Sequence, residues 1–270
     1  MSHAIAVFIL LVLAHAATVH AELRFVMRSE ARKAATADAA NLPNPMMAMG
    51  ADMLVKMIFP EGPAVSTYII GPRGARVELA QASAGMPAGT IMLSLADWTS
   101  AVLNPTEQTY WTMPAPPASV MQGVFAQMKP EVSVAPSGSF EVISGVRAER
   151  VAMTVSMQLP IPPGTQLPPG LEPTLKMSSD MWVTDRFREY SVPAGQTFLP
   201  GMPSLGDLMP KGFIMRSVLR GSLFGAYEIE SVVTEIGEEA ASAELFEIPK
   251  NFKEVESPIK GIRGAAPRVP

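Results

Sequence analysis

Residues 150–159 read Arg-Val-Ala-Met-Thr-Val-Ser-Met-Gln-Leu, and this stretch decides the fold class. Apolar side chains occupy every second position from Val151 to Leu159, and smaller or polar side chains stand between them. Successive side chains of a β-strand point to opposite faces of its sheet, so the pattern predicts a strand with one apolar and one wetted face. Such strands are typical of antiparallel sheets.

The same two-residue period recurs along the chain. It is clear at 23–28, 53–59 and 75–79, and weaker at about 65–70, 90–96, 108–113, 176–184, 213–220 and 225–236. In the second of these segments, one strand face is expected to carry Met53, Val55, Met57 and Phe59. Gly71-Pro72-Arg73-Gly74 reads as a hairpin turn. The sequence therefore predicts roughly ten strands.

Helical signals are few. Residues 117–129 carry apolar side chains at helical spacing and predict an amphipathic helix lying on the sheet. A short helical turn is expected at 242–246, ended by Pro249. The proline-rich segments 159–175 and 193–212 predict long loops. Since neither a linker nor a repeat divides the chain, we expect one β-rich domain at 22–256 and a loose tail at 257–270.

Composition agrees with a β-rich chain. Of the 270 residues, 48% are hydrophobic and 17% charged, with 26 Pro and 20 Gly, which favours many short elements over long helices. The net charge of -4 offers no field that would gather phosphates or anionic lipid, so binding to nucleic acid is not expected.

The first 21 residues resemble a secretory signal peptide. An apolar run from Ala4 to Leu13 is too short to span a bilayer, and Val19-His20-Ala21 places small residues at the -3 and -1 positions of a cleavage site. Cleavage after Ala21 predicts a periplasmic or secreted protein without a transmembrane span. The start lacks Lys and Arg, so an uncleaved anchor remains the alternative.

Cleavage would also remove every histidine, because His3, His15 and His20 all precede Glu22, and the chain has no Cys. Catalysis by Ser-His-Asp or Cys-His groups is thereby excluded, as are zinc, haem and iron-sulfur sites that need imidazole or thiolate. Carboxylates remain as acid-base groups. Asp97, Asp180 and Asp185 lie near expected strand ends, but turn capping is the commoner role of such residues. We therefore expect neither an enzyme nor a cofactor.

Methionine is unusually frequent, with 19 residues, and five of them lie together: Met46, Met47, Met49, Met53 and Met57. Exported thioether clusters can hold Cu(I), but methionine is also a flexible core filler. The second interpretation predicts no metal site. Trp182 is out of phase with Met181 and Val183, so we expect it on the other face of its strand. Six arginines interleaved with acids predict a solvated face: Arg147, Arg150, Arg186, Arg188, Arg216 and Arg220.

Four segments occur in one order along the chain: 102–110 (Val-Leu-Asn-Pro-Thr-Glu-Gln-Thr-Tyr), 144–146 (Ser-Gly-Val), 181–185 (Met-Trp-Val-Thr-Asp) and 243–252 (Ala-Glu-Leu-Phe-Glu-Ile-Pro-Lys-Asn-Phe). Together they resemble a family of exported bacterial proteins of unknown function, similar in strand layout to the lipoprotein carriers and receptors of the Lol system. The resemblance covers about Leu23 to Val255.

This resemblance implies a mainly β, α+β fold, in which one strongly curved antiparallel sheet forms a half-barrel covered by one or two helices and the loops. In Lol-like proteins the concave apolar face receives acyl chains. The expected function is therefore non-enzymatic binding of a lipid, or of the hydrophobic part of a partner. The expected apolar-ligand face comprises Met53, Val55, Met57, Phe59, Met153, Val155 and Met157. The alternative is an envelope scaffold protein whose core is self-filled. The oligomeric state stays open.

Overall fold

The computed structural model describes residues 21–34, 45–83, 85–94, 100–113, 130–158, 174–190, 210–221 and 224–257, and only the backbone of 45–48. The expected signal peptide, the helix at 117–129, Asp97 and most of the two proline-rich loops lie outside these residues, so those predictions stay predictions. The domain boundaries at 22 and 256 also stay predictions. The described residues contain no helix long and apolar enough to cross a membrane.

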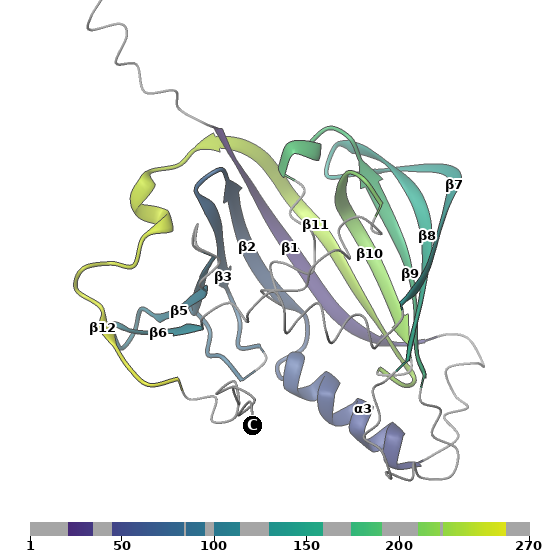
Figure 1. Cartoon of the computed structure of the whole chain (residues 1–270), viewed down its shortest axis with the longest axis horizontal. Coiled ribbons are helices and arrows are strands. Elements are labelled where there is room, and N and C mark those ends of the chain that lie inside the picture. Colours follow the sequence, from purple (N-terminus) through teal and green to yellow (C-terminus); the bar gives the residue numbers. More distant parts are fainter. Residues whose placement is uncertain are drawn as a thin grey trace, which may run out of the picture.

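The described strands form one twelve-stranded sheet (Figure 1). The strands are β1 Ala21–Lys33, β2 Ala64–Gly71, β3 Gly74–Leu79, β4 Ile91–Ser94, β5 Ser100–Asn104, β6 Thr109–Met113, β7 Glu131–Ile143, β8 Val146–Gln158, β9 Thr174–Thr184, β10 Phe213–Gly221, β11 Tyr227–Ala240 and β12 Lys253–Glu254. Their order in the sheet is β12-β6-β5-β4-β3-β2-β1-β11-β10-β9-β8-β7. All neighbours are antiparallel except β12 and β6, which are parallel. One α-helix, α3 Pro45–Ile58, and two 3-10 helices, η1 Arg188–Tyr190 and η2 Ala243–Phe246, complete the described elements.

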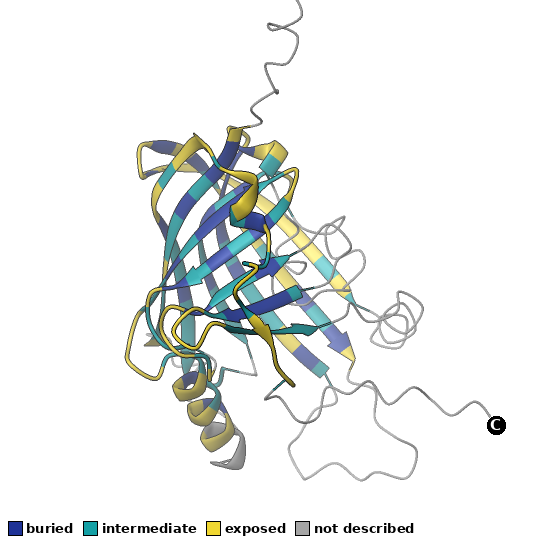
Figure 2. Ribbon diagram, turned by 90° about the vertical axis from the view of Figure 1, so that its left-hand side faces the viewer, coloured by how far each residue is buried: buried dark blue, intermediate teal, exposed yellow. Residues whose placement is uncertain are grey.

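The sheet is strongly curved, as the half-barrel prediction requires (Figure 1). Its main core joins β1 to its neighbour β2 and to β10, which is not a neighbour. The Phe25 ring on β1 stacks on Tyr68 of β2 and meets Phe213 of β10 edge-on, with centroids 4.6 and 5.1 Å apart. Register shifts at Val26/Met27 and at Ile214/Arg216 supply bulges, which bend strands and increase their twist. Buried residues alternate with less buried ones along β3 and along parts of β8 and β9 (Figure 2).

The sequence located nine of the twelve strands and missed β5, β7 and β12. β7 was missed because its alternation is interrupted, with the register against β8 shifting between Pro136 and Phe140. The hairpin turn at 71–74 is confirmed by the pairing of Gly71 with Gly74. The turn at 242–246 is confirmed as η2. Residues after it pack on β4–β6, where Ile248 and Phe252 cover Leu93 and Leu103.

The strand expected at 53–59 is wrong, because this segment belongs to helix α3. Ala51 and Val55 are buried and Leu54 and Ile58 half-buried, which is the i, i+3, i+4, i+7 spacing of a helix face. Pro45 begins the helix, a position that proline favours. A seven-residue window showed a two-residue period, whereas the full 14-residue segment has the helical one. A hydrogen bond with Asp52 on the helix raises the pKa of Tyr227, at the start of β11.

Candidate functional site

One face of β7, β8 and β9 carries two apolar clusters that are separate from the main core. Residues directly opposite each other on neighbouring strands share a face. The register aligns Val132, Val155 and Met177 in one row and Pro136, Val151 and Met181 in another. We call the full set the β7–β9 face: Val132, Val134, Pro136, Phe140, Val142, Arg147, Glu149, Val151, Met153, Val155, Met157, Leu175, Met177, Ser179, Met181 and Val183.

A tight turn sets this register. Ser144 and Gly145, between β7 and β8, both have positive φ angles, 48° and 77°. Two successive positive φ angles are those of a type I′ turn, whose twist matches that of antiparallel strands. The Ser144 hydroxyl also donates a hydrogen bond to the carbonyl of Val233 on β11, 2.7 Å away. The hairpin tip is thereby fixed against a distant strand.

Burial on the β7–β9 face changes from strand to strand. On β8 and β9, Val151 packs with Met181 and Val183 in one buried cluster, and Val155 packs with Met157 and Leu175 in another. On β7, the last strand of the described sheet, three apolar side chains are instead exposed: Val134 by 39%, Phe140 by 52% and Val142 by 69%. The face is closed in its middle and open along its edge.

The structure brings together only part of the expected ligand-binding set. Met153, Val155 and Met157 share the β7–β9 face and one cluster. Met53 and Met57 are exposed on helix α3, Val55 is buried on the same helix, and Phe59 follows its end. The four residues between 53 and 59 therefore do not form one strand face. Contact of a ligand with these four, or with the three on β8, stays a prediction.

A cavity of about 370 Å³ opens on the exposed part of the β7–β9 face. Its lining residues are Val134, Pro136, Phe140, Arg147, Glu149, Val151, Val183, Thr184, Asp185, Pro210 and Lys211. Val151 and Val183 also belong to the first buried cluster, so the cavity rests on packed apolar side chains. We call it the Phe140 cavity.

Four charged side chains line the Phe140 cavity together with its valines and Phe140. Arg147 and Lys211 are cationic, and Glu149 and Asp185 are anionic. The Arg147 guanidinium lies over the Phe140 ring, with its carbon 3.9 Å from the ring centroid. Within the described part of the chain, none of these four residues forms an ion pair, either with one another or with any other residue.

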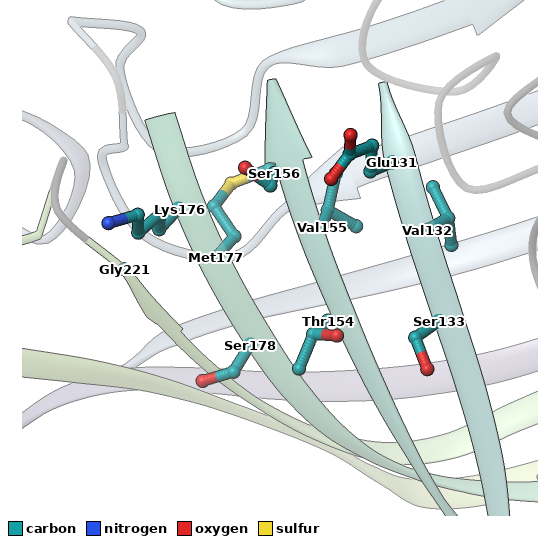
Figure 3. Close-up of a pocket in the computed structure, with 10 residues that line it drawn as sticks. All are labelled: Glu131, Val132, Ser133, Thr154, Val155, Ser156, Lys176, Met177, Ser178 and Gly221. Carbon is teal, nitrogen blue, oxygen red and sulfur yellow. The ribbon is translucent and has the colours of Figure 1, made fainter. Parts of the chain in front are cut away.

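A second cavity, of about 480 Å³, borders the same strands and is drawn in Figure 3. Figure 3 shows Ser133, Thr154 and Ser178 in a row across β7, β8 and β9, as their register requires. Alternation places this row on the face opposite Val155. The wall also includes Glu131, Val132, Val155, Ser156, Lys176, Met177 and Gly221. The lining of this Thr154 cavity thus combines hydroxyl side chains with apolar and charged ones.

The face of β8–β11 that lies opposite the β7–β9 face carries a network of ion pairs. Asp180 accepts hydrogen bonds from Arg150 at 2.8 Å and from Arg220 at 2.9 Å. Burial by itself would raise the pKa of Asp180, but the hydrogen bonds and charges of the two arginines outweigh it, so the pKa lies below its usual value. A carboxylate held in this way serves the network rather than acid-base catalysis.

Trp182 lies on the face opposite its neighbours Met181 and Val183, as expected, because both neighbours are buried in the first cluster. The Arg216 and Arg150 guanidinium carbons lie 4.5 and 5.8 Å from its ring centroid. Three of the arginines expected on a merely solvated face, Arg150, Arg216 and Arg220, are thus engaged in ion pairs. In the described ranges, no group of three or more His, Cys, Asp or Glu residues could hold a metal ion.

Sequence reasoning missed the exposed edge of this site. Val132 and Val134 alternate with serine and alanine before the Pro136 break, and Phe140 and Val142 alternate with polar residues after it. Each half is a readable strand signal when the two halves are scored separately. No motif in the sequence around Lys211 identifies it as a site residue, because it lines the cavity from the segment before β10.

No protein-family model and no curated protein matches the chain. Among solved structures, the chain is similar to the crystal structure of a LolA superfamily protein from Nitrosomonas europaea. The sequence identity is 8% and the TM-score 0.29, over 84% of this chain and 90% of that one. A likeness at this level of identity and score supports no statement about what the chain does. Membership of an uncharacterised exported family therefore stays a prediction.

Proposed function

We propose that this protein is an exported, non-enzymatic binding protein that takes an apolar ligand on the β7–β9 face. The observation that carries the proposal is the row of exposed side chains on β7, Val134, Phe140 and Val142, beside the Phe140 cavity. Three large apolar side chains on one face of one strand cost free energy in water unless something covers them. A lipid or the hydrophobic part of a partner would provide that cover.

The chemistry of the wall supports an adaptable site. Cavities that hold small ligands are mostly apolar and measure roughly 300–1,000 Å³, and the Phe140 cavity measures about 370 Å³. Met153 and Met177 are half-buried on the same face, next to the second cluster. Methionine has three rotatable bonds and repacks readily, so these side chains allow the space to enlarge around a chain-like ligand.

The alternative function, a scaffold protein with a self-filled core, also has an observation in its favour. Val155, Met157 and Leu175 are buried against one another. If the whole face were closed in this way, the purified protein would take up no apolar ligand. Uptake of a fluorescent fatty acid by the wild-type protein therefore separates the two functions.

The variant Val134→Asp locates the binding. Val134 is 39% exposed, so water reaches the new carboxylate and the variant stays folded. The charge should weaken binding of the fatty acid by about tenfold or more, since it disrupts apolar contact. Ser133→Asp is the matched control, because Ser133 is exposed on the other face of the same strand. Unchanged binding by folded Val134→Asp would contradict the proposed site.

A further inference from the structure

The Phe140 cavity is lined by two cationic and two anionic side chains, and among the described residues no ion pair joins them. Glu149 on β8 pairs in register with Val183 on β9. Arg147 lies two residues before Glu149 on β8, and Asp185 directly follows the end of β9 at Thr184, two residues after Val183, so both lie beyond the same end of the β8–β9 pairing. Both line the cavity, yet no ion pair joins them among the described residues. Both charges therefore remain available to a ligand.

The position of Arg147 determines which part of it a ligand can reach. Its guanidinium lies over the Phe140 ring at 3.9 Å, so the ring covers one flat side of the group. The N–H donors of a guanidinium point outward in its own plane and remain usable in such a stack. A planar fork of donors suits a phosphate or a carboxylate, which it binds through two parallel hydrogen bonds.

The other residues limit which anion fits. Glu149 and Asp185 lie in the same cavity, so a purely anionic ligand would meet two like charges there. A purely cationic ligand would meet Arg147 and Lys211. A ligand that carries both signs avoids both conflicts, since its anionic group can bind Arg147 or Lys211 while its ammonium group binds a carboxylate.

From this arrangement we infer that the ligand is a lipid with a zwitterionic head, in which a phosphate is followed by an ammonium group. The inference rests on the proposed function, because the apolar part of the same molecule is to lie on Val134, Val151 and Phe140. It adds the headgroup chemistry and the residues that select it.

Binding of short-chain lipids tests the inference. Three probes are used below their micelle concentrations: dihexanoyl phosphatidylethanolamine, dihexanoyl phosphatidylglycerol and octyl glucoside. Displacement of the fluorescent fatty acid gives each affinity. We expect the zwitterionic lipid to bind about tenfold more tightly than either of the others, the size of effect that one charge-assisted pair gives. Equal affinities for all three would overturn the headgroup inference and leave the proposed function standing.

Variants assign the selectivity to particular residues. Arg147→Gln should lower the ratio of phosphatidylethanolamine to glucoside affinity about tenfold, and Glu149→Gln should raise the relative affinity for phosphatidylglycerol. Arg186→Gln is the matched control, since Arg186 lies over the Phe187 ring at 5.1 Å but does not line the cavity. Selectivity that survives both cavity variants, in proteins with unchanged melting temperature, would overturn the assignment.

Free phosphoethanolamine separates a lipid site from a site for the headgroup alone. Without acyl chains it loses the apolar contacts, so we expect far weaker binding than for the dihexanoyl lipid. Binding as tight as that of the lipid would overturn the inference in favour of a small polar ligand. Failure of every amphiphile to bind would overturn the proposed function as well.

Discussion

The carboxylate of Glu22, whose side chain is fully buried, ties the start of β1 to two distant segments. It accepts a hydrogen bond from Arg73 Nε at 3.2 Å, on the β2–β3 hairpin, and another from the backbone N–H of Ala241 at 3.0 Å, just after β11. The Glu22 side chain packs closely against Gly71, because a Cβ added at Gly71 would lie 2.6 Å from Glu22 Cγ.

Glu22→Ala should therefore be destabilising. It removes the partner of Arg73, whose side chain is 38% exposed, and of a backbone N–H, and such losses cost about 1–3 kcal/mol. Urea denaturation gives the change in the free energy of unfolding. Glu239→Ala is the control, since among the described residues its side chain forms a single, exposed ion pair with Arg24, and it should cost about 0.5 kcal/mol or less. Similar losses in both variants would contradict the role of Glu22.

Val155→Asp tests whether the closed middle of the β7–β9 face is core. Val155 is 5% exposed and packs with Met157 and Leu175, so a carboxylate there is buried without a partner. Such burial costs several kcal/mol, and a domain is stable by only about 5–15 kcal/mol. Circular dichroism should show an unfolded or strongly destabilised protein.

Thr154→Asp is the matched control on the exposed face of the same strand, and it should melt near the wild-type temperature. If Val155→Asp instead stays folded and loses uptake of the fatty acid, ligand-accessible space extends from the Phe140 cavity into the middle of the face. A folded Val155→Asp protein with full uptake would contradict both roles of this strand.

The stability of the ion-pair network should depend on pH through Asp180. The pKa of Asp180 is lower in the folded protein than its ordinary value, owing to Arg150 and Arg220. A lowered folded-state pKa stabilises the protein above the unfolded pKa of about 4, and this stabilisation is lost as the pH falls through the folded value. The free energy of unfolding should therefore fall more steeply below about pH 4 in the wild type than in Asp180→Asn. Parallel pH profiles would count against this role.

Processing after Ala21 would leave Glu22 as the mature N-terminus. The Tyr190 hydroxyl donates a hydrogen bond to the Ala21 carbonyl at 3.0 Å, and Ala21 pairs with Ala240. The scissile bond thus lies within the folded sheet, so we expect cleavage to precede folding. Intact-mass measurement of exported material should give the chain from Glu22 onward. A mass that includes residues 1–21 would favour the uncleaved anchor and would restore all three histidines.

The elements that the sequence revealed are those whose signal is local. β8 was readable because Val151, Met153, Val155 and Met157 alternate without interruption. α3 was misread because Met53, Val55 and Met57 mimic that alternation over a short window, whereas the burial of Ala51 and Val55 follows the helix period. Periodicity alone does not separate the two for short apolar runs.

The site was less predictable because its residues meet only through folding. Arg147, Asp185 and Lys211 reach the Phe140 cavity from three separate segments, and no spacing in the sequence relates them. The contact between Glu22 and Arg73 likewise joins residues 51 positions apart. The half-barrel shape itself was suggested by a resemblance, since alternation indicates sheet faces but not how a sheet bends.

The interruption that hid β7 also affects how two copies of this protein can meet. An outermost strand offers unpaired N–H and C=O groups to any other extended chain, and long regular edges of this kind lead to fibrous self-association. Pro136 has no N–H to offer, and Gly138, with a φ of 67°, leaves the extended conformation. Ladder formation along β7 would stop at this point. An edge that exposes Val134 and Phe140 is thereby protected against polymerisation through the same strand.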